Sequence, residues 1–205
     1  MKRKLSVKLS AIATVNAGYP FRGKIPELVG SASVVVQMKD VSLTEGICWT
    51  DCLETELTGK RAPDYLTTGD ILVASRGSHN YAVLVDQALS FTGKKAVASP
   101  HFFLVRLNKD ALKKGILPEF MVWLLNQSTA QRHFEQNAEG TLTKSIRRRV
   151  LEEVPVVVPP IEKQRTIIAM ANTLGEEKRL IQKLINNGES MMSAIASDLY
   201  LAQSD

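Results

Sequence analysis

Basic and hydrogen-bonding side chains gather in the turns of this 205-residue sequence. The densest group is the run 140–149, where helical spacing would place Lys144, Arg147 and Arg148 on one face. Arginine offers a planar fork that binds phosphate oxygens or the O6/N7 edge of guanine, and serine and threonine hydroxyls add shorter contacts. The pattern therefore predicts a polyanion-binding surface. The candidate DNA contacts are Arg22, Lys24, Arg76, Ser78, His79, Asn80, Lys94, Lys95, Lys144, Ser145, Arg147 and Arg148.

The sequence signatures of several enzyme classes are missing. There is no GxxxxGK(S/T) phosphate loop, no GxGxxG motif after a strand and no GxSxG nucleophile elbow. The three histidines stand apart from one another. We expect His101, in an apolar strand, and His133, on a helix, to be structural, whereas His79 lies in a turn from which its ring can project. The sequence thus predicts no catalytic residue.

Metal binding is not predicted either. Cys48 and Cys52 are the only cysteines and have no nearby histidines, so we expect two reduced thiols around Trp49 rather than a zinc site. Asp64 and Asp70 do not supply the two acids and lysine of a metal nuclease. Asp70 is expected in the turn before a strand, where its carboxylate would bond backbone amides. We expect this chain to bind no metal and no cofactor.

The charge is distributed unevenly along the chain. Lysine and arginine number 26 against 21 acidic residues, which gives a net charge of +5 and an isoelectric point of about 9.2. Residues 1–160 hold 21 basic and 15 acidic side chains, whereas residues 161–205 hold five and six. Affinity for a polyanion is therefore expected in the first 160 residues, and the tail needs another role.

The first 160 residues show strand patterns joined by turns and interrupted by one helix. Pro118 and Glu119 favour a helix start, and the apolar residues that follow predict a helix running towards Gln136. The turn at 77–80 predicts a β-hairpin. The predicted strands are 33–38, 71–75, 81–85, 101–107 and 154–158, the last with Pro155 at an edge or strand start.

The tail has the repeat of a coiled-coil helix. Alternating three- and four-residue steps give a seam in which eight of ten positions are apolar, and a helix over about 162–201 would be roughly 60 Å long. Asn186-Asn187-Gly188 leaves open a kink or a two-helix hairpin. The seam is expected to meet another helix, and the alternative is packing on the chain's own body. The predicted contact residues are Ile167, Ala171, Leu174, Ile181, Ile185, Met192, Ile195 and Leu199.

Composition excludes several classes of protein. With 44% hydrophobic and 23% charged residues the chain can bury a core, so disordered and collagen-like classes do not fit. No apolar run approaches the ~20 residues needed to span a bilayer, and the residues after Lys4 lack the apolar region of a signal peptide. We expect a cytoplasmic protein with no membrane partner.

Motifs in a recognisable order cover nearly the whole chain. Residues 8–13 (KLSAIA) precede Gly18 and Phe21, and residues 66–77 (LTTGDILVASRG) form a central block. The last block spans residues 138–174. It contains, in order, an Ala-x-Gly triplet at 138–140, Leu151, Val154-Pro155, Pro159-Pro160, Gln164 and Ile167-Ile168. This order resembles the DNA-specificity (S) subunits of type I restriction-modification systems, in a half-length form.

The resemblance implies an α+β chain. Residues 1–160 would form a mixed α/β target recognition domain with a twisted, largely antiparallel sheet, and 161–205 a conserved spacer and dimerisation helix. The domain would read one half of a bipartite site in double-stranded DNA. Methyltransferase (M) subunits, and in some systems a restriction/translocase (R) subunit, would dock on the chain. The M subunits would bind S-adenosylmethionine and methylate the flipped base, and two copies would form a homodimer through the helix.

Two alternatives stay open from the residues. One is a helical interaction or scaffold protein in which the positive charge only aids solubility. The other is a small DNA-processing enzyme, either a nuclease or a fragment of a methyltransferase. The missing motifs weigh against the enzyme, and charge reversal of the basic cluster would separate a DNA reader from a scaffold.

Overall fold

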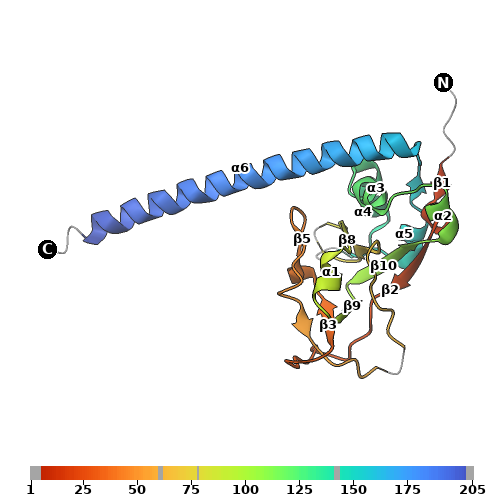
Figure 1. The fold of residues 1–205 in the computed structure, drawn as a ribbon, viewed down its shortest axis with the longest axis horizontal. Coiled ribbons are helices and arrows are strands. Elements are labelled where there is room, and N and C mark those ends of the chain that lie inside the picture. Colours follow the sequence, from red (N-terminus) through yellow and green to blue (C-terminus); the bar gives the residue numbers. More distant parts are fainter. Residues whose placement is uncertain (1–5, 60–61, 78, 141–143, 202–205) are drawn as a thin grey trace. The chain divides into compact units, whose positions relative to one another are not determined.

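The computed structural model describes residues 6–59, 62–77, 79–140 and 144–201 (Figure 1). The chain divides into two compact units, the first ending at Ile168 and the second beginning at Ala169. The fold class is α+β, with mostly antiparallel sheets followed by a long C-terminal helix, as predicted. Ser78 and residues 141–143 of the basic run lie outside the described residues.

The elements follow one another as short strands and helices before the long helix. The strands are β1 (Val7–Lys8), β2 (Ala13–Ala17), β3 (Ser33–Val36), β4 (Val41–Ser42), β5 (Gly46–Ile47), β6 (Leu53–Glu54), β7 (Ile71–Ala74), β8 (Ala82–Leu84), β9 (Lys95–Ala98), β10 (Phe102–Leu107) and β11 (Pro155–Val156). The helices are η1 (Leu9–Ala11), η2 (Met38–Asp40), α1 (Ala88–Phe91), α2 (Lys109–Lys113), α3 (Pro118–Leu125), α4 (Ser128–Asn137), α5 (Arg148–Glu152) and α6 (Ile161–Leu201).

The central sheet has the strand order β2-β10-β7-β8, and each neighbouring pair is antiparallel. Apolar clusters cover both of its faces. Ile71 and Val73 of β7 belong to one cluster, whereas Leu72 and Ala74 belong to the other, because successive side chains of a strand point to opposite faces. The hairpin predicted around residues 77–80 is confirmed as β7 and β8.

A second sheet has the order β6-β3-β9, in which β3 and β9 run parallel. The strands predicted at 33–38 and 101–107 are confirmed as β3 and β10. The strand predicted at 154–158 is confirmed in the two residues of β11, where Pro155 pairs with Lys8 of β1 in a two-stranded sheet. Proline at the first position of such a short strand removes no donor from a central ladder.

The single helix predicted from Pro118 towards Gln136 is wrong. The chain forms α3 and α4 instead, with Gln127 extended between them at φ −82° and ψ 155°. The Asn126 side chain explains the break. Its carbonyl accepts from the Ala82 amide at 2.8 Å and its amide donates to the Ala82 carbonyl at 2.8 Å, so Asn126 pairs with the backbone of β8 as a strand would.

Lys144, Arg147 and Arg148 would share a face only if their run were helical, and the run is not helical before Arg148. Helix α5 begins only at Arg148, and Arg147 is extended at φ −81° and ψ 154°. Before it, the Ile146 amide donates to the Ser75 carbonyl at 2.8 Å. Ile146 is buried, so this segment gains more from joining the core and the hairpin than from an exposed helical turn.

A buried glutamine holds the start of α6 against the first unit. Gln164 is 1% exposed, and its carbonyl accepts from the Leu117 amide at 3.0 Å. Its side-chain amide donates to the carbonyls of Gly115 at 3.1 Å and Pro159 at 2.9 Å. These bonds satisfy a polar side chain in the core, and the first turns of α6 are thereby tied to the segment before α3.

The long helix α6 confirms the predicted tail, since it is a 41-residue helix about 60 Å long. It is uninterrupted through Asn187 and Gly188, so neither a helix stop nor a two-helix hairpin forms there. Its apolar seam is exposed. The exposed large apolar residues of the predicted seam are Leu174, Ile181, Ile185, Met192, Ile195 and Leu199.

Replacing the buried glutamine tests this anchor. The Gln164→Ala chain is expected to lose about 2–4 kcal/mol of unfolding free energy, because the Leu117 amide and two carbonyls lose their buried partners. Urea denaturation followed by tryptophan fluorescence measures this. Gln182→Ala, which removes an exposed bond to Asn186 in the same helix, should cost less than about 0.5 kcal/mol. Equal losses of unfolding free energy in the Gln164→Ala and Gln182→Ala chains would contradict the proposed role of Gln164.

Candidate nucleic-acid interface

One edge of the central sheet collects loops from distant parts of the sequence. In an antiparallel order, the end of β2, the start of β10, the end of β7 and the start of β8 lie at the same edge. The ends of the parallel strands β3 and β9 meet there too: the Ser99 amide donates to the Val36 carbonyl at 2.9 Å, and the Phe102 amide donates to the Ser99 carbonyl at 3.0 Å. We call this the loop edge. It comprises the described residues 18–24, 37–39, 75–77, 79–80 and 99–101 and the attached segment 144–147.

Close backbone packing at Gly18 joins the two sheets. The Gly18 amide donates to the Phe102 carbonyl at 3.0 Å, and the Tyr19 amide donates to the Ala98 carbonyl at 2.8 Å. A Cβ atom on Gly18 would lie 2.0 Å from the Ser99 carbonyl oxygen. Only glycine fits at this crossing, which explains the glycine in the motif that opens the chain.

The hairpin loop holds the segment 144–146. The Gly77 amide donates to the Lys144 carbonyl at 3.1 Å, and Arg76 and Ser145 form an antiparallel bridge. Gly77 has a φ of +120°, which glycine adopts at little cost. Arg76, Lys144 and Ser145, predicted separately as DNA contacts, are therefore neighbours in the structure.

The loop edge is strongly positive. Its segments contain no aspartate or glutamate. Asp40 follows directly, but it is 3% exposed and accepts a hydrogen bond from the Gln37 amide at 2.8 Å. Side chains that are exposed and basic remain for an anionic ligand. They are Arg22, Lys24, Lys39, Arg76, His79, His101, Lys144 and Arg147.

An open groove accompanies the first loop. Its volume is about 620 Å³, and its lining includes Tyr19, Phe21, Arg22 and Lys24. The rings of Tyr19 and Phe21 pack edge to face at 5.0 Å between centroids. Tyr19 is buried and its hydroxyl accepts from the Gly59 amide at 2.6 Å, so the groove offers an anionic ligand mainly the exposed cations Arg22 and Lys24.

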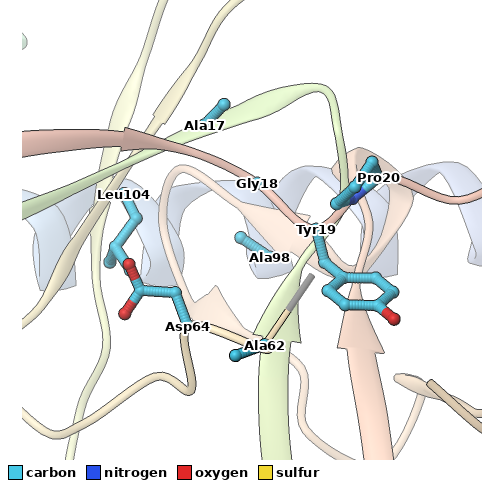
Figure 2. Close-up of a pocket in the computed structure, with 8 residues that line it drawn as sticks. All are labelled: Ala17, Gly18, Tyr19, Pro20, Ala62, Asp64, Ala98 and Leu104. Carbon is cyan, nitrogen blue, oxygen red and sulfur yellow. The ribbon is translucent and has the colours of Figure 1, made fainter. Parts of the chain in front are cut away.

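A smaller recess beside Gly18 is closed to such ligands. Figure 2 shows the residues that line it, with Ala98 close to Gly18 and Ala62 next to Asp64. Its volume is about 10 Å³, which is room for about one water molecule. The recess therefore belongs to the packing of the fold.

Several predicted contacts lie elsewhere or have other partners. Lys94 forms an ion pair with Glu54, and the Lys95 ammonium lies 5.0 Å from the centre of the Tyr65 ring. Lys94 directly precedes β9 and Lys95 is its first residue. Both therefore lie at the end of β9 that is remote from residues 99–101 of the loop edge. Arg148 pairs with Glu152 within α5 at 2.7 Å. Arg147 is at the loop edge but pairs with Glu139 at 2.9 Å.

Asn80 has a structural role, contrary to its prediction as a DNA contact. It is 6% exposed, and its side-chain amide donates to the Ala74 carbonyl at 2.9 Å. Its own carbonyl accepts from Gln131 at 3.1 Å. A buried amide with these partners closes the hairpin rather than facing a ligand.

Two basic residues of the loop edge were not predicted. Lys39 stands after β3, and His101 lies in the turn before β10 rather than inside the strand. His101 is exposed, so its predicted structural role inside a strand is wrong. Partial burial, and secondarily the charge of Arg76, lower the pKa of His101 below its usual value. The antiparallel pairing of β7 and β10, which places residue 101 beside residue 75, is the signal that could have found it.

His133 is structural, as predicted. Its Nε2 atom lies 3.0 Å from the Val150 carbonyl, which links α4 to α5.

The opposite edge of the sheet carries a carboxylate–guanidinium network. The Asp70 carboxylate accepts from the Thr67 amide at 2.8 Å, as predicted for a turn. It also accepts from Nε and Nη2 of Arg106, each at 2.7 Å, and Asp64 accepts from Nη1 at 3.2 Å. These bonds raise the pKa of Arg106. In this network the guanidinium of Arg106 is engaged by two carboxylates, those of Asp64 and Asp70.

The cysteine segment is a packed thiol region. Cys52 is buried, and burial raises the pKa of its thiol to about 12, while Cys48 is exposed. Within the described ranges no cluster of histidine, cysteine and acidic side chains is suited to hold a metal ion. Nor does any described helix have the length and apolar character needed to cross a membrane.

Comparison with solved structures identifies the fold. The chain superposes on a structure that describes the assembly and conformational transition of a type I restriction-modification system, with a TM-score of 0.64 at 13% identity. It also matches the HsdS subunit from Thermoanaerobacter tengcongensis, with a TM-score of 0.57 at 18% identity. For the S subunit of such a system from M. genitalium the TM-score is 0.54 at 15% identity.

These matches cover 95%, 90% and 89% of this chain but 44%, 45% and 41% of the other chains. The chain therefore spans less than half the length of the structures it matches. No family model matches the sequence, and no curated protein matches it. The resemblance predicted from the motif order is thus supported at the level of the fold.

Adding one methyl group at the sheet crossing tests how the loop edge is built. Gly18→Ala is expected to destabilise the chain by about 3 kcal/mol or more, since the new Cβ would lie 2.0 Å from the Ser99 carbonyl oxygen. Thermal unfolding followed by tryptophan fluorescence measures the loss. Gly175→Ala, in open space on α6, should be neutral or stabilising by up to about 1 kcal/mol. If the Gly18→Ala chain is as stable as the parent, the close backbone contact between Gly18 and Ser99 is refuted.

Proposed function

We propose that this chain is the DNA sequence-recognition subunit of a type I restriction-modification methyltransferase complex. The observation that carries the proposal is the loop edge, where segments far apart in the sequence bring exposed cations together without a carboxylate of their own. The fold shared with S subunits supports the same function. The first unit would read one half of a bipartite site in double-stranded DNA.

Within this proposal the loop edge divides its work between phosphates and bases. Phosphate contacts from lysine and arginine set the position on the duplex but carry no sequence information, whereas side chains in a groove read base edges. Arg22, Lys24, Arg76 and Lys144 are the proposed cationic contacts. Ser145 and His79 add hydrogen bonds. Arg147 is left out of the proposed contacts, because it pairs with Glu139 at 2.9 Å.

Other predicted residues are left out of this surface for physical reasons. Lys94 and Lys95 already have partners near Glu54 and Tyr65. Arg148 has Glu152. A cation that already has an intramolecular partner gains less from a phosphate, because the first interaction must be broken.

The chain would not itself be catalytic. M subunits docked on it would bind S-adenosylmethionine, flip the target base and methylate it, and an R subunit would join where DNA is cleaved. The proposed location of the complex is the cytoplasm, where the DNA is. This chain's own residues would bind and orient the duplex.

The seam of α6 is proposed to pack against the same seam of a second copy. A single helix cannot bury its own apolar stripe, and Ile181, Ile185 and Ile195 are 56%, 48% and 48% exposed. Two copies related by a two-fold axis would present two loop edges. Such a dimer would recognise an interrupted palindrome.

Charge reversal tests the DNA surface. Binding of the purified chain to mixed-sequence duplex DNA, measured by fluorescence anisotropy, should weaken steeply with salt, by about 0.9 log units per neutralised phosphate for each tenfold rise. The double variant Arg76→Glu with Lys144→Glu should bind at least about tenfold more weakly and with a shallower salt slope.

The matched control is Lys94→Glu with Lys95→Glu, which makes the same change of net charge away from the loop edge. It should retain most of the affinity. Salt-insensitive binding, or equal losses in both variants, would contradict the proposed surface. DNA selectivity that survives reversal at the loop edge would favour a helical scaffold whose charge serves only solubility.

Charging the helix seam tests the second copy. Ile181→Glu with Ile185→Glu should convert a dimer of twice 22.6 kDa into a monomer, because two buried apolar side chains per copy become charged. Sedimentation equilibrium measures the mass. Gln182→Glu with Asn186→Glu adds the same charges beside the seam and should leave the dimer intact. A parent chain that is monomeric at micromolar concentration would contradict the proposed dimer.

A further inference from the structure

His101 is held in a fixed place at the loop edge. Its carbonyl accepts two hydrogen bonds from Ser75, one from the backbone amide at 2.8 Å and one from the hydroxyl at 2.8 Å. Residue 75 adjoins Arg76, and the bridge between Arg76 and Ser145 brings in Lys144. The three segments that carry Arg76, His101 and Lys144 are therefore joined to one another through their backbones.

The side chains of this group face solvent. Arg76, His101 and Lys144 are all exposed. The neighbouring charge that affects the imidazole is that of Arg76, and it acts together with partial burial to lower the pKa of His101. The free chain therefore carries a mostly neutral His101 at neutral pH.

The remaining charged groups of the adjacent segments do not neutralise this cluster. Asp40 is buried and accepts from the Gln37 amide. Glu139 accepts from Nε of Arg147 at 3.0 Å. Lys39 and His79 are exposed, and neither brings negative charge.

We propose that His101, Arg76 and Lys144 form a phosphate-binding site that takes up a proton when duplex DNA binds. This inference rests on the function proposed above. A phosphate between the two permanent cations would lie beside the imidazole and would accept a hydrogen bond from its protonated form. The proton comes from the solvent, and no covalent bond changes.

The sign of the pH dependence follows from the charges. A bound phosphate stabilises imidazolium, so the pKa of His101 is higher in the complex than in the free chain. Affinity for DNA therefore rises as the pH falls through the bound-state pKa, and it levels off below the free-state pKa. The effect adds to the permanent attraction of arginine and lysine, whose charges do not change in this range.

Binding curves at two pH values test the site. The full chain, the His101→Gln variant and the control variant His133→Gln are titrated into mixed-sequence duplex DNA at constant ionic strength, at pH 7.5 and pH 6.0. The His133 ring lies 3.0 Å from the Val150 carbonyl, outside the loop edge. The parent and His133→Gln chains should bind about threefold to tenfold more tightly at the lower pH. His101→Gln should lose this gain.

Each other outcome overturns a distinct claim. If His101→Gln keeps the full gain, or if His133→Gln loses it instead, the site is wrong while the proposed DNA function stands. If the parent chain does not bind DNA at either pH, both proposals fail. Should His101→Gln unfold, NMR titration of the His101 ring in the parent chain decides. The ring pKa must rise on adding the duplex, and an unchanged value refutes the site.

Discussion

The hydrogen bonds of one buried glutamine fix the start of the long helix to the body of the chain. Gln164 satisfies the Leu117 amide and the carbonyls of Gly115 and Pro159, so its burial costs no unpaired polar group. Without this side chain, the segment before α3 and the end of the Pro159-Pro160 turn would each keep a buried group in need of a partner. Apolar packing cannot replace it, because hydrocarbon offers neither donor nor acceptor.

The antiparallel order of the central sheet is the second constraint, and it creates the loop edge. It places the turn before β10 beside the loop after β7, and the backbone contact at Gly18 brings the second sheet to the same place. The segments that carry Arg76, His101 and Lys144 are bonded to one another through their backbones, which gives these three residues a fixed support. Charge is then separated by position, since Arg106 and Asp70 pair at the opposite edge.

The proposed function uses both constraints. The cationic loop edge would position the chain on a DNA duplex, and the exposed apolar seam of α6 would bind a second helix. The positive charge resides in the first 160 residues and the seam in the tail, so DNA binding and association with a second helix need not compete for the same residues. His101 adds a group whose charge depends on the ligand itself.

The sequence by itself determined the elements whose signals are local. Continuous apolar and β-branched runs bounded by turn residues predicted β3, β7, β8 and β10, the three-and-four spacing predicted α6, and the motif order predicted the fold. Tertiary structure decided the rest. Asn126 ends α3 because β8 lies within reach, residues 144–146 are extended because Ser75 accepts their amide, and Asn80 is buried by its neighbours. Likewise, His101 and Arg76 became neighbours through strand pairing across 25 residues of sequence. Such contacts depend on which segments pack together in the folded chain, and the local spacing of residue types does not predict this.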